Sequence, residues 1–249
     1  MISWAARKQL TYFFVLILIA LAIGFYVFIK VTSPTCFDGK QNQNEDGVDC
    51  GGSCSEKCLG IIKDLVVVWS RPISVEDGVY DAVALVDNPN IFLGVYSVNY
   101  TFRVYDENNV LIAISPGQTF IAPGERFALF ASKIDVGHTV PARAFLEFDK
   151  NINWQKIETG NAKILVTNKE FTNGEYPHMN IVIGNKSLSP AKNISAVAVL
   201  YDRDKNIIGA SSTSLDSILG ENSISVVFTW PKPFKEEPDS TEVFLRTRI

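Results

Sequence analysis

The chain has 249 residues, which is enough for one large domain or for two domains of about 100 residues each. Its net charge is −4 at pH 7, and its 23 Lys and Arg residues are scattered among 27 Asp and Glu residues. This distribution forms no basic stripe for phosphate contacts, so we expect no nucleic-acid partner. The hydrophobic fraction of 47% is ordinary for a globular protein, but apolar residues concentrate in one block near the N-terminus.

The apolar block at residues 10–29 is long enough to cross a membrane. It contains no charged residue, and at about 1.5 Å per residue it spans about 30 Å, the thickness of a bilayer's hydrocarbon core. Arg7 and Lys8 precede the block, whereas only Lys30 follows it before the acidic residues that begin at Asp38. The positive-inside rule therefore predicts a cytoplasmic tip at residues 1–9, a single transmembrane helix at 10–31 and an extracytoplasmic remainder in the cell membrane.

Two other interpretations fit the apolar block less well. A cleaved signal peptide has an apolar stretch of about 7–15 residues followed by a small-residue cleavage site. Here the stretch is longer, and residues 26–30 offer no such site. A type IV pilin stem would carry a glutamate early in the apolar run, and this run has none. We therefore expect the helix to be retained as an anchor.

All four cysteines lie in the segment 32–59, at Cys36, Cys50, Cys54 and Cys58. An even number of cysteines just outside a membrane is typical of two disulfides, because exported thiols are normally oxidised. Three pairings are possible, and the spacing does not choose among them. The alternative is a four-cysteine zinc site, but such sites usually supply close cysteine pairs on two separate arms.

The stretch between the first two cysteines is rich in oxygen ligands. Candidate ligands for a calcium ion are Asp38, Asn42, Asn44, Asp46 and Asp49. Alternate carboxylate and amide oxygens followed by a glycine mimic the start of an EF-hand loop. The twelfth position of that loop is Ser53, where a bidentate glutamate belongs. The alternative is a solvated polar loop held by disulfides, so the sequence predicts no cofactor other than a possible calcium ion.

The cysteine segment resembles short modules of bacterial and archaeal surface proteins with the pattern C-x-D-G-x-x-N-x-x-E-x-x-x-D-C-G-G-x-C-x-x-C. The matching residues are Cys36, Asp38, Gly39, Asn42, Glu45, Asp49, Cys50, Gly51, Gly52, Cys54 and Cys58, with one extra residue before the last cysteine. The resemblance implies a spacer or an adhesive piece of an exported protein.

Beyond the last cysteine, short apolar or alternating runs are separated by Gly, Pro, Asn and Asp, which predicts successive β-strands. The first set of expected strands is 61–69, 80–86, 95–105, 110–114, 118–121, 126–131 and 142–148. The second set is 162–167, 179–183, 194–201, 207–210, 223–228 and 241–246. We expect an all-β fold with two tandem β-sandwich domains, at residues 60–150 and 151–249, and a junction near 149–153.

A spacing of 96 residues relates the two sets. Matching pairs are Tyr80 with Tyr176, Val86 with Val182, Tyr105-Asp106 with Tyr201-Asp202, Ile112 with Ile208, and Gly124-Glu125 with Gly220-Glu221. Asn88 and Asn185 also correspond if one residue is inserted. A period of this length is that of a whole sandwich domain and far exceeds a solenoid unit.

Both copies resemble the FxLYD-like domains, an immunoglobulin-like β-sandwich family of exported prokaryotic proteins. The motif reads Phe102-Arg103-Val104-Tyr105-Asp106 in the first copy and Ala198-Val199-Leu200-Tyr201-Asp202 in the second, so each copy departs at one position. The resemblance implies the immunoglobulin-like fold and an exported context, and it implies no catalytic residues.

Residue types that carry catalysis are scarce. His138 and His178 occupy non-equivalent places in the two copies, and neither lies in a metal-binding spacing. The sequence has no G-x-S-x-G motif and no cysteine after Cys58. We therefore expect no enzyme and no catalytic residue. The aromatic residues are expected in the core except Trp230, which precedes a Pro-Lys-Pro turn and is expected at the surface.

The leading hypothesis is a membrane-anchored, extracytoplasmic binding or structural protein, an accessory part of a cell-surface or envelope assembly. Its partners would be the membrane, through the N-terminal helix, and an unidentified protein or surface. The alternatives are an exported enzyme with an unrecognised site and a calcium-stiffened stalk. A buried ionisable cluster in a cleft would favour the enzyme.

Overall fold

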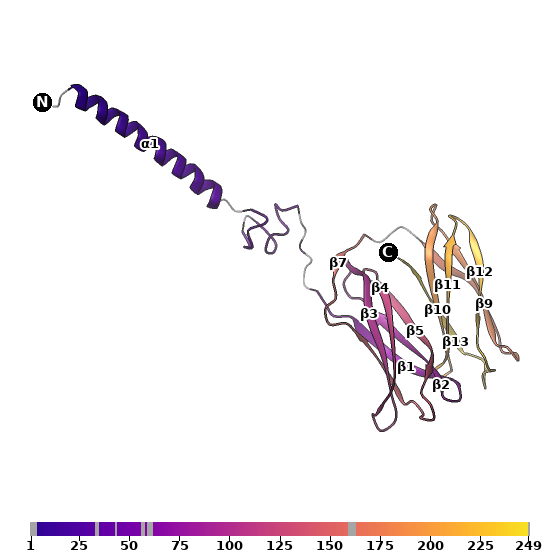
Figure 1. The fold of residues 1–249 in the computed structure, drawn as a ribbon. Helices are drawn as coiled ribbons and strands as arrows, with labels where there is room; N and C mark the ends of the chain where they lie inside the picture. Colours follow the sequence, from indigo (N-terminus) through magenta and orange to yellow (C-terminus); the bar gives the residue numbers. More distant parts are fainter. Residues whose placement is uncertain are drawn as a thin grey trace. The chain divides into compact units, whose positions relative to one another are not determined.

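The computed structural model describes residues 4–32, 35–42, 44–55, 58, 62–158 and 163–248. The chain divides into two compact units, Met1–Gly60 and Ile61–Ile249. The first unit holds one helix and the cysteine module, which we define as residues 35–58. The second unit holds all the described strands (Figure 1).

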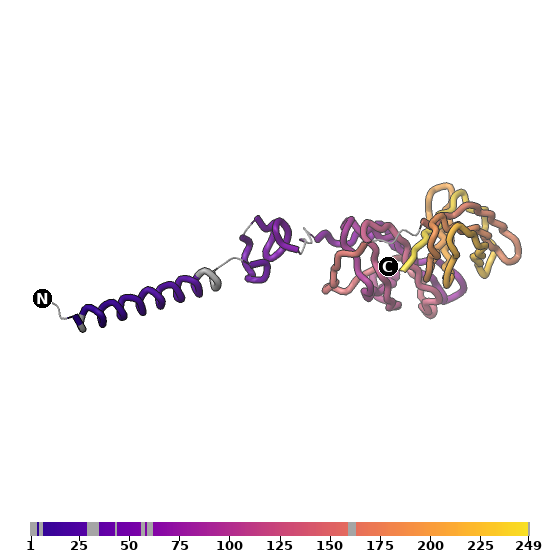
Figure 2. Tube along the Cα trace, turned by 90° about the horizontal axis from the view of Figure 1, so that it is seen from above, coloured from indigo at the N-terminus to yellow at the C-terminus, as the bar shows by residue number. Residues whose placement is uncertain are grey.

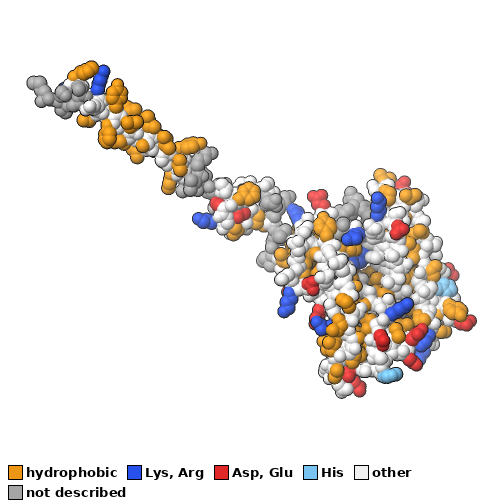
Figure 3. Space-filling view, viewed as in Figure 1, with side chains coloured by type: hydrophobic (Ala, Val, Ile, Leu, Met, Phe, Trp, Pro, Cys, Tyr) orange, Lys and Arg blue, Asp and Glu red, His pale blue; other side chains and the backbone are white. Residues whose placement is uncertain are grey.

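Helix α1 (Trp4–Thr32) contains the expected transmembrane segment and begins earlier than expected. Its stretch Arg7–Phe28 is long and apolar enough to cross a membrane, and none of it is buried within the protein. Hydrophobic side chains cover the visible side of the helix (Figure 3). A soluble helix would hide such a surface against a core, so this helix is compatible with membrane anchoring.

The second unit is built from strands, as expected. The first six are β1 (Val66–Glu76), β2 (Val79–Asp87), β3 (Leu93–Tyr105), β4 (Leu111–Ile121), β5 (Arg126–Asp135) and β6 (Arg143–Phe148). The others are β7 (Gln155–Lys156), β8 (Ile164–Thr172), β9 (His178–Asn185), β10 (Ala191–Tyr201), β11 (Ile207–Ile218), β12 (Ser223–Thr229) and β13 (Ser240–Thr247). Among the described residues, no helix lies outside α1.

The strands form two sandwiches with the same pairing order. The sheets of the first are β1-β2-β5 and β4-β3-β6, and those of the second are β12-β9-β8 and β11-β10-β13, all antiparallel. In each, the first, second and fifth strands pair, as do the fourth, third and sixth. The expected all-β, sandwich-type fold is confirmed.

The two sandwiches also pack against each other, through the sheets β1-β2-β5 and β11-β10-β13. Each sandwich has its own core, and a third core lies between them. The central strands β2 and β10 are therefore covered on both faces: the runs 82–86 and 196–200 are buried throughout. Figure 2 shows the two sandwiches side by side along the chain trace.

One strand and one boundary differ from expectation. The expected strands 110–114 and 118–121 form the single strand β4, which continues through Pro116. Because β4 is a sheet edge, it can accommodate a proline. The segment 149–157, where we expected the junction, packs on the first sandwich: Trp154 lies against its core, and β7 pairs with β3. We therefore place the boundary after Ile157. Parts of two expected strands, residues 61 and 162, lie outside the described residues.

The connecting segments gather at two ends of this unit. We call "proximal" the end where the chain enters at residue 62, and "distal" the opposite end. The proximal loops are 62–65, 88–92, 122–125, 149–158, 163, 186–190, 219–222 and 248. The distal loops are 77–78, 106–110, 136–142, 173–177, 202–206 and 230–239. Both sandwiches have their proximal ends on the same side, because Arg246 near the end of β13 contacts Glu125 in the β4–β5 turn.

Candidate functional sites in the cysteine module and between the sandwiches

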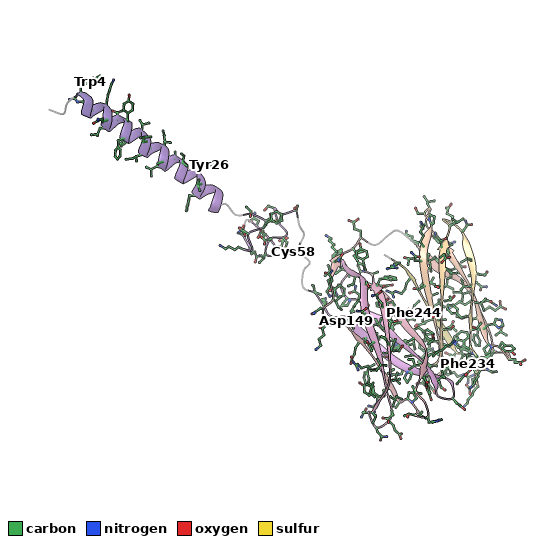
Figure 4. The ribbon with its side chains drawn as sticks, in the orientation of Figure 1. Trp4, Tyr26, Cys58, Asp149, Phe234 and Phe244 are labelled. Atoms are coloured by element: carbon green, nitrogen blue, oxygen red, sulfur yellow. A yellow bond between two sulfur atoms is a disulfide. The ribbon has the colours of Figure 1, made fainter. Side chains whose placement is uncertain are left out.

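Two disulfides close the cysteine module, Cys36–Cys54 and Cys50–Cys58. They join residues 18 and 8 positions apart, so the first cysteine pairs with the third and the second with the fourth. The expectation of two disulfides is confirmed, and it leaves no thiolate for the alternative zinc site. Figure 4 labels Cys58 at the end of this module.

Three of the five candidate calcium ligands lie together. The carboxylate of Asp49 accepts hydrogen bonds from the backbone N–H groups of Asp38 and Gly39, each at 2.9 Å at its closest. The carboxylate of Asp38 accepts one from the side chain of Asn42 at 3.0 Å. This bond, with those from backbone N–H groups, lowers the pKa of Asp38 below its ordinary value. These carboxylates therefore already have partners within the module.

The other two candidate ligands lie elsewhere. Asp46 accepts a hydrogen bond from the N–H of Gly52 at 3.2 Å, and Asn44 is exposed with a φ of 66°. Glu45, which we had not proposed as a ligand, is buried beside the Cys54 sulfur at 3.1 Å. It joins Cys36 and Cys54 in a close group, but both sulfurs of that group are held in a disulfide. Calcium binding at Asp38, Asn42, Asn44, Asp46 and Asp49 stays a prediction.

Two buried asparagines hold equivalent proximal loops. The side-chain N–H groups of Asn88 donate to the carbonyls of Leu93 and Ala122, both at 2.8 Å. Those of Asn185 donate to carbonyls that include Ile218 at 3.1 Å. Each asparagine thus joins the loop after the second strand to the turn before the fifth. Because the amide groups satisfy buried carbonyls, we assign both residues a structural role.

The two histidines do not come together. His138 lies in the exposed β5–β6 loop, and His178 opens β9 with its Nδ1 at 3.0 Å from the carbonyl of Tyr176. Over the described ranges, neither histidine joins a group of potential metal ligands. These positions give no geometric support to a histidine-based site.

Trp230 is buried, so its expected surface position is wrong. Its indole N–H donates to the carbonyl of Ala210 at 3.1 Å, and its ring packs edge-on against Phe171 and Phe234. The rings of Trp230 and Phe234 fit over Gly209, where an added Cβ would lie 2.8 Å from Phe234. A glycine thus makes room for an aromatic cluster that local sequence does not indicate.

The core between the sandwiches is made of small and branched apolar side chains. Its buried members are Ile73, Val83, Ala128, Val197, Val199 and Ala210. Phe244 packs against this core from β13 and lies between the two sandwiches in Figure 4. Small residues allow the two sheets to approach closely, and burial of their apolar surface stabilises the pair.

A buried ion pair joins the sandwiches at one side of this core. Arg246 of β13 contacts both carboxylate oxygens of Glu125, at 2.7 and 2.9 Å. The guanidinium also donates to Thr119 Oγ1 at 2.9 Å and lies 4.0 Å from the ring centres of Phe120 and Phe127. The side chains of Arg246 and Glu125 are only 5% and 16% exposed. Because the planar guanidinium group of Arg246 has several partners in the first sandwich, it fixes the relative orientation of the two sandwiches.

A second polar contact lies at another seam between the sandwiches. The hydroxyl of Tyr201 donates to Glu242 at 3.1 Å, in a cleft that Arg126 of the first sandwich also lines. Burial, followed by the nearby Glu242 carboxylate, raises the pKa of Tyr201 above its ordinary value. The phenol therefore stays protonated at neutral pH and acts as a hydrogen-bond donor.

An open groove with mostly apolar walls lies at the distal end between the two sandwiches. Its walls include Ile73, Val79 and Phe130 of the first sandwich and Tyr176, Ile208 and Phe234 of the second. Asp81 also lines it and accepts a hydrogen bond from the N–H of Lys133 at 2.9 Å. Burial raises the pKa of Asp81 above its ordinary value. We call this feature the distal groove.

Sequence reasoning missed the interface between the sandwiches. One usable signal was present, because the continuous apolar runs at 82–86 and 196–200 are typical of strands covered on both faces. No sequence signal identified Arg246 as the partner of Glu125, which lies 121 positions away.

No protein-family model and no curated protein matches the chain. The resemblances to FxLYD-like domains and to the cysteine modules therefore stay predictions from the sequence, and the functional argument rests on the geometry.

Proposed function

We propose that this protein is anchored in a membrane by α1 and binds a partner, without catalysis, on the extracytoplasmic side. Two observations support the anchoring: a solvent-exposed apolar helix of sufficient length, and two disulfides, which persist in oxidising compartments. Arg7 and Lys8 before the apolar run support a cytoplasmic N-terminus by the positive-inside rule. In this proposal the protein is an accessory part of a cell-surface or envelope assembly.

The observation that carries the binding proposal is the joining of two sandwiches into one compact unit. Their shared core and the Arg246–Glu125 pair hold both walls of the distal groove. A preformed surface loses little conformational entropy when it binds, which favours recognition. A flexible tandem of separate domains could not maintain a groove between them.

The charges of the distal loops indicate the chemistry of the partner. The distal loops contain nine acidic residues: Asp77, Asp106, Glu107, Glu175, Asp202, Asp204, Glu236, Glu237 and Asp239. They contain four basic residues: Arg203, Lys205, Lys232 and Lys235. The charged residues that line the groove are balanced, Glu76 and Asp81 against Lys133 and Lys232, whereas the distal loops as a whole are acidic. An apolar groove at an acidic end of the unit fits a protein segment with apolar side chains flanked by Lys or Arg, because opposite charges steer encounter and favour the matching partner. We propose such a segment as the occupant.

The anchoring is tested with the full chain carrying one epitope tag at each terminus. Protease added to intact cells should remove the C-terminal tag and leave the N-terminal tag intact. Alkaline carbonate should leave the protein in the membrane fraction. Protection of the C-terminal tag would reverse the orientation, and release by carbonate would exclude the anchor.

The binding site is tested by cross-linking the full chain in its native membrane. Tyr176→Ser changes a side chain of the distal groove that is 75% exposed, whereas Val140→Ser changes a side chain that is 71% exposed in the β5–β6 loop and does not line the groove. Neither substitution affects a core. A cross-linked partner should be retained by Val140→Ser and lost by Tyr176→Ser, and its capture should weaken as salt screens the acidic distal loops. Equal capture by both variants would exclude the groove.

A further inference from the structure

Four large apolar side chains point into solvent from the proximal loops. Ile91 and Phe92 are 68% and 65% exposed in the β2–β3 loop of the first sandwich. In the second sandwich, Leu188 is 85% exposed in the corresponding β9–β10 loop, and Leu219 is 62% exposed in the β11–β12 turn. They project from loops that the buried Asn88 and Asn185 hold in place. Large apolar side chains exposed together on such loops indicate an interaction surface.

The chain enters the sandwiches beside one of these tips. The N–H of Lys63 donates to Asn90 Oδ1 at 2.9 Å, and Asn90 Nδ2 donates to the carbonyl of Lys63 at 2.7 Å. Asn90 directly precedes Ile91 and Phe92. Lys63, which lies at the entry of the chain into the sandwiches, is therefore fixed to the loop that carries the first apolar tip.

The length of the connection limits how far the sandwiches can move from α1. Residues 33–61 could span about 100 Å if fully extended, and the two disulfides shorten that reach. A tether of this length keeps the proximal loops at a high effective concentration near any bilayer that holds α1. A weak contact with that bilayer would therefore be populated.

The two ends differ in charge. The proximal loops contain six basic residues: Lys63, Lys150, Lys156, Lys163, Lys186 and Arg248. They contain five acidic residues, Asp64, Glu125, Asp149, Glu158 and Glu221, of which Glu125 is paired with Arg246. The distal loops have nine acidic and four basic residues, as described above. An anionic surface would therefore repel the distal end and accept the proximal end.

We propose that the proximal loops contact the bilayer that holds α1, with Ile91, Phe92, Leu188 and Leu219 entering the headgroup region. The lysines around them contact anionic lipid headgroups, while their alkyl stems lie along the apolar tips. The occupant of this surface is the lipid bilayer itself. This inference rests on the anchoring in the proposed function, and it adds an orientation in which the distal groove faces away from the membrane.

The experiment uses the full chain in liposomes with a lipid that carries a photoactivatable diazirine on its acyl chain. Liposomes of phosphatidylcholine alone are compared with liposomes that also contain phosphatidylglycerol, and labelled peptides are identified by mass spectrometry. We expect label on α1, on the peptide with Ile91 and Phe92, and on the peptide with Leu188, but none on the distal loops. Anionic lipid should increase the loop labelling, because each lysine near an anionic surface contributes about fivefold in affinity.

Matched variants distinguish a specific contact from non-specific adsorption to the lipid. Phe92→Ser should reduce labelling of its own loop and of the Leu188 loop, whereas Tyr176→Ser, which removes an exposed aromatic ring at the distal end, should change neither. Label on α1 but not on the proximal loops, or equal label on the proximal and distal loops, would overturn this inference and leave the anchoring intact. Absence of label from α1 would overturn both.

Discussion

Replacing Arg246 by methionine should destabilise the two-sandwich unit strongly. Met removes the charge but keeps much of the side-chain length, so the Glu125 carboxylate would stay nearly buried without a cation. Breaking a buried pair by removing one partner costs about 3–5 kcal/mol. Since Glu125 is 16% exposed and water can reach it, we take the lower value, about 3 kcal/mol. For a unit of this size that corresponds to a fall in Tm of about 6–12 °C.

The loss should arise mainly from the unpaired charge, and a double-mutant cycle tests this. The variant Arg246→Met with Glu125→Leu removes both charges, so it should recover most of the stability. The matched control is Arg103→Met, which removes the cation of the exposed Arg103–Glu147 pair, whose side chains are 35% and 56% exposed. That change should cost no more than about 1 kcal/mol.

The assay is urea unfolding of residues 62–249, followed by tryptophan fluorescence. Because the third core joins the sandwiches, we expect one cooperative transition in the wild type. A cost below about 1 kcal/mol for Arg246→Met, or a double variant no more stable than the single one, would refute the reasoning.

Three further predictions concern other parts of the molecule. In Cys36→Ser, alkylation without reductant should modify only Cys54, and label at another cysteine would contradict the pairing. Burial raises the pKa of Asp81 in the folded state, so the protein loses stability as the pH rises above 3.8, the pKa of this carboxyl in the unfolded chain. Asp81→Asn should therefore be more stable than the wild type in urea at pH 7, and the difference should fade below pH 3.8. Gly209→Ala should cost about 1–3 kcal/mol in urea unfolding, because aromatic rings cover the site, whereas Gly174→Ala, with nothing within 4 Å of its new Cβ, should cost much less.

The sequence predicted the elements that depend on local pattern. The apolar helix and most strands follow from the length and period of their hydrophobic runs, and the strand pairs follow from the polar turns between them. The pairing of Cys36 with Cys54 could not be predicted, because four cysteines with this spacing permit three connectivities. The candidate calcium ligands were chosen by type alone, and the structure places three of the five together.

The features that were missed depend on contacts between distant residues. Trp230 follows a strand and precedes a proline-rich turn, which resembles a surface position, yet a glycine far earlier in the chain leaves room for its ring. Arg246 and Glu125 are residue types that are normally exposed, so neither indicates burial. Only the packing of one sandwich on the other makes them partners.

The repeat itself contains a signal for the interface that a residue-by-residue match overlooks. The sandwiches meet through non-equivalent sheets, since β1-β2-β5 of the first packs on β11-β10-β13 of the second. Positions that face the interface in one copy must therefore face solvent in the other. Arg103 lies on an outer face and pairs with Glu147. Its counterpart 96 residues later, Val199, is buried in the shared core.

The same exchange occurs on the opposite sheets, once the register is corrected. The core-facing residues Ala82 and Val86 correspond to Met179 and Ile183, so the spacing along β2 and β9 is 97, and the expected match of Val86 with Val182 is one residue off. At this spacing the buried Val83 corresponds to the exposed Asn180. Apolar and polar residues thus exchange between the copies at faces where a lone sandwich would be solvated. Such exchanges place the contact between the two sandwiches, and within the motif they account for Arg103 in the first copy where the second copy has Val199.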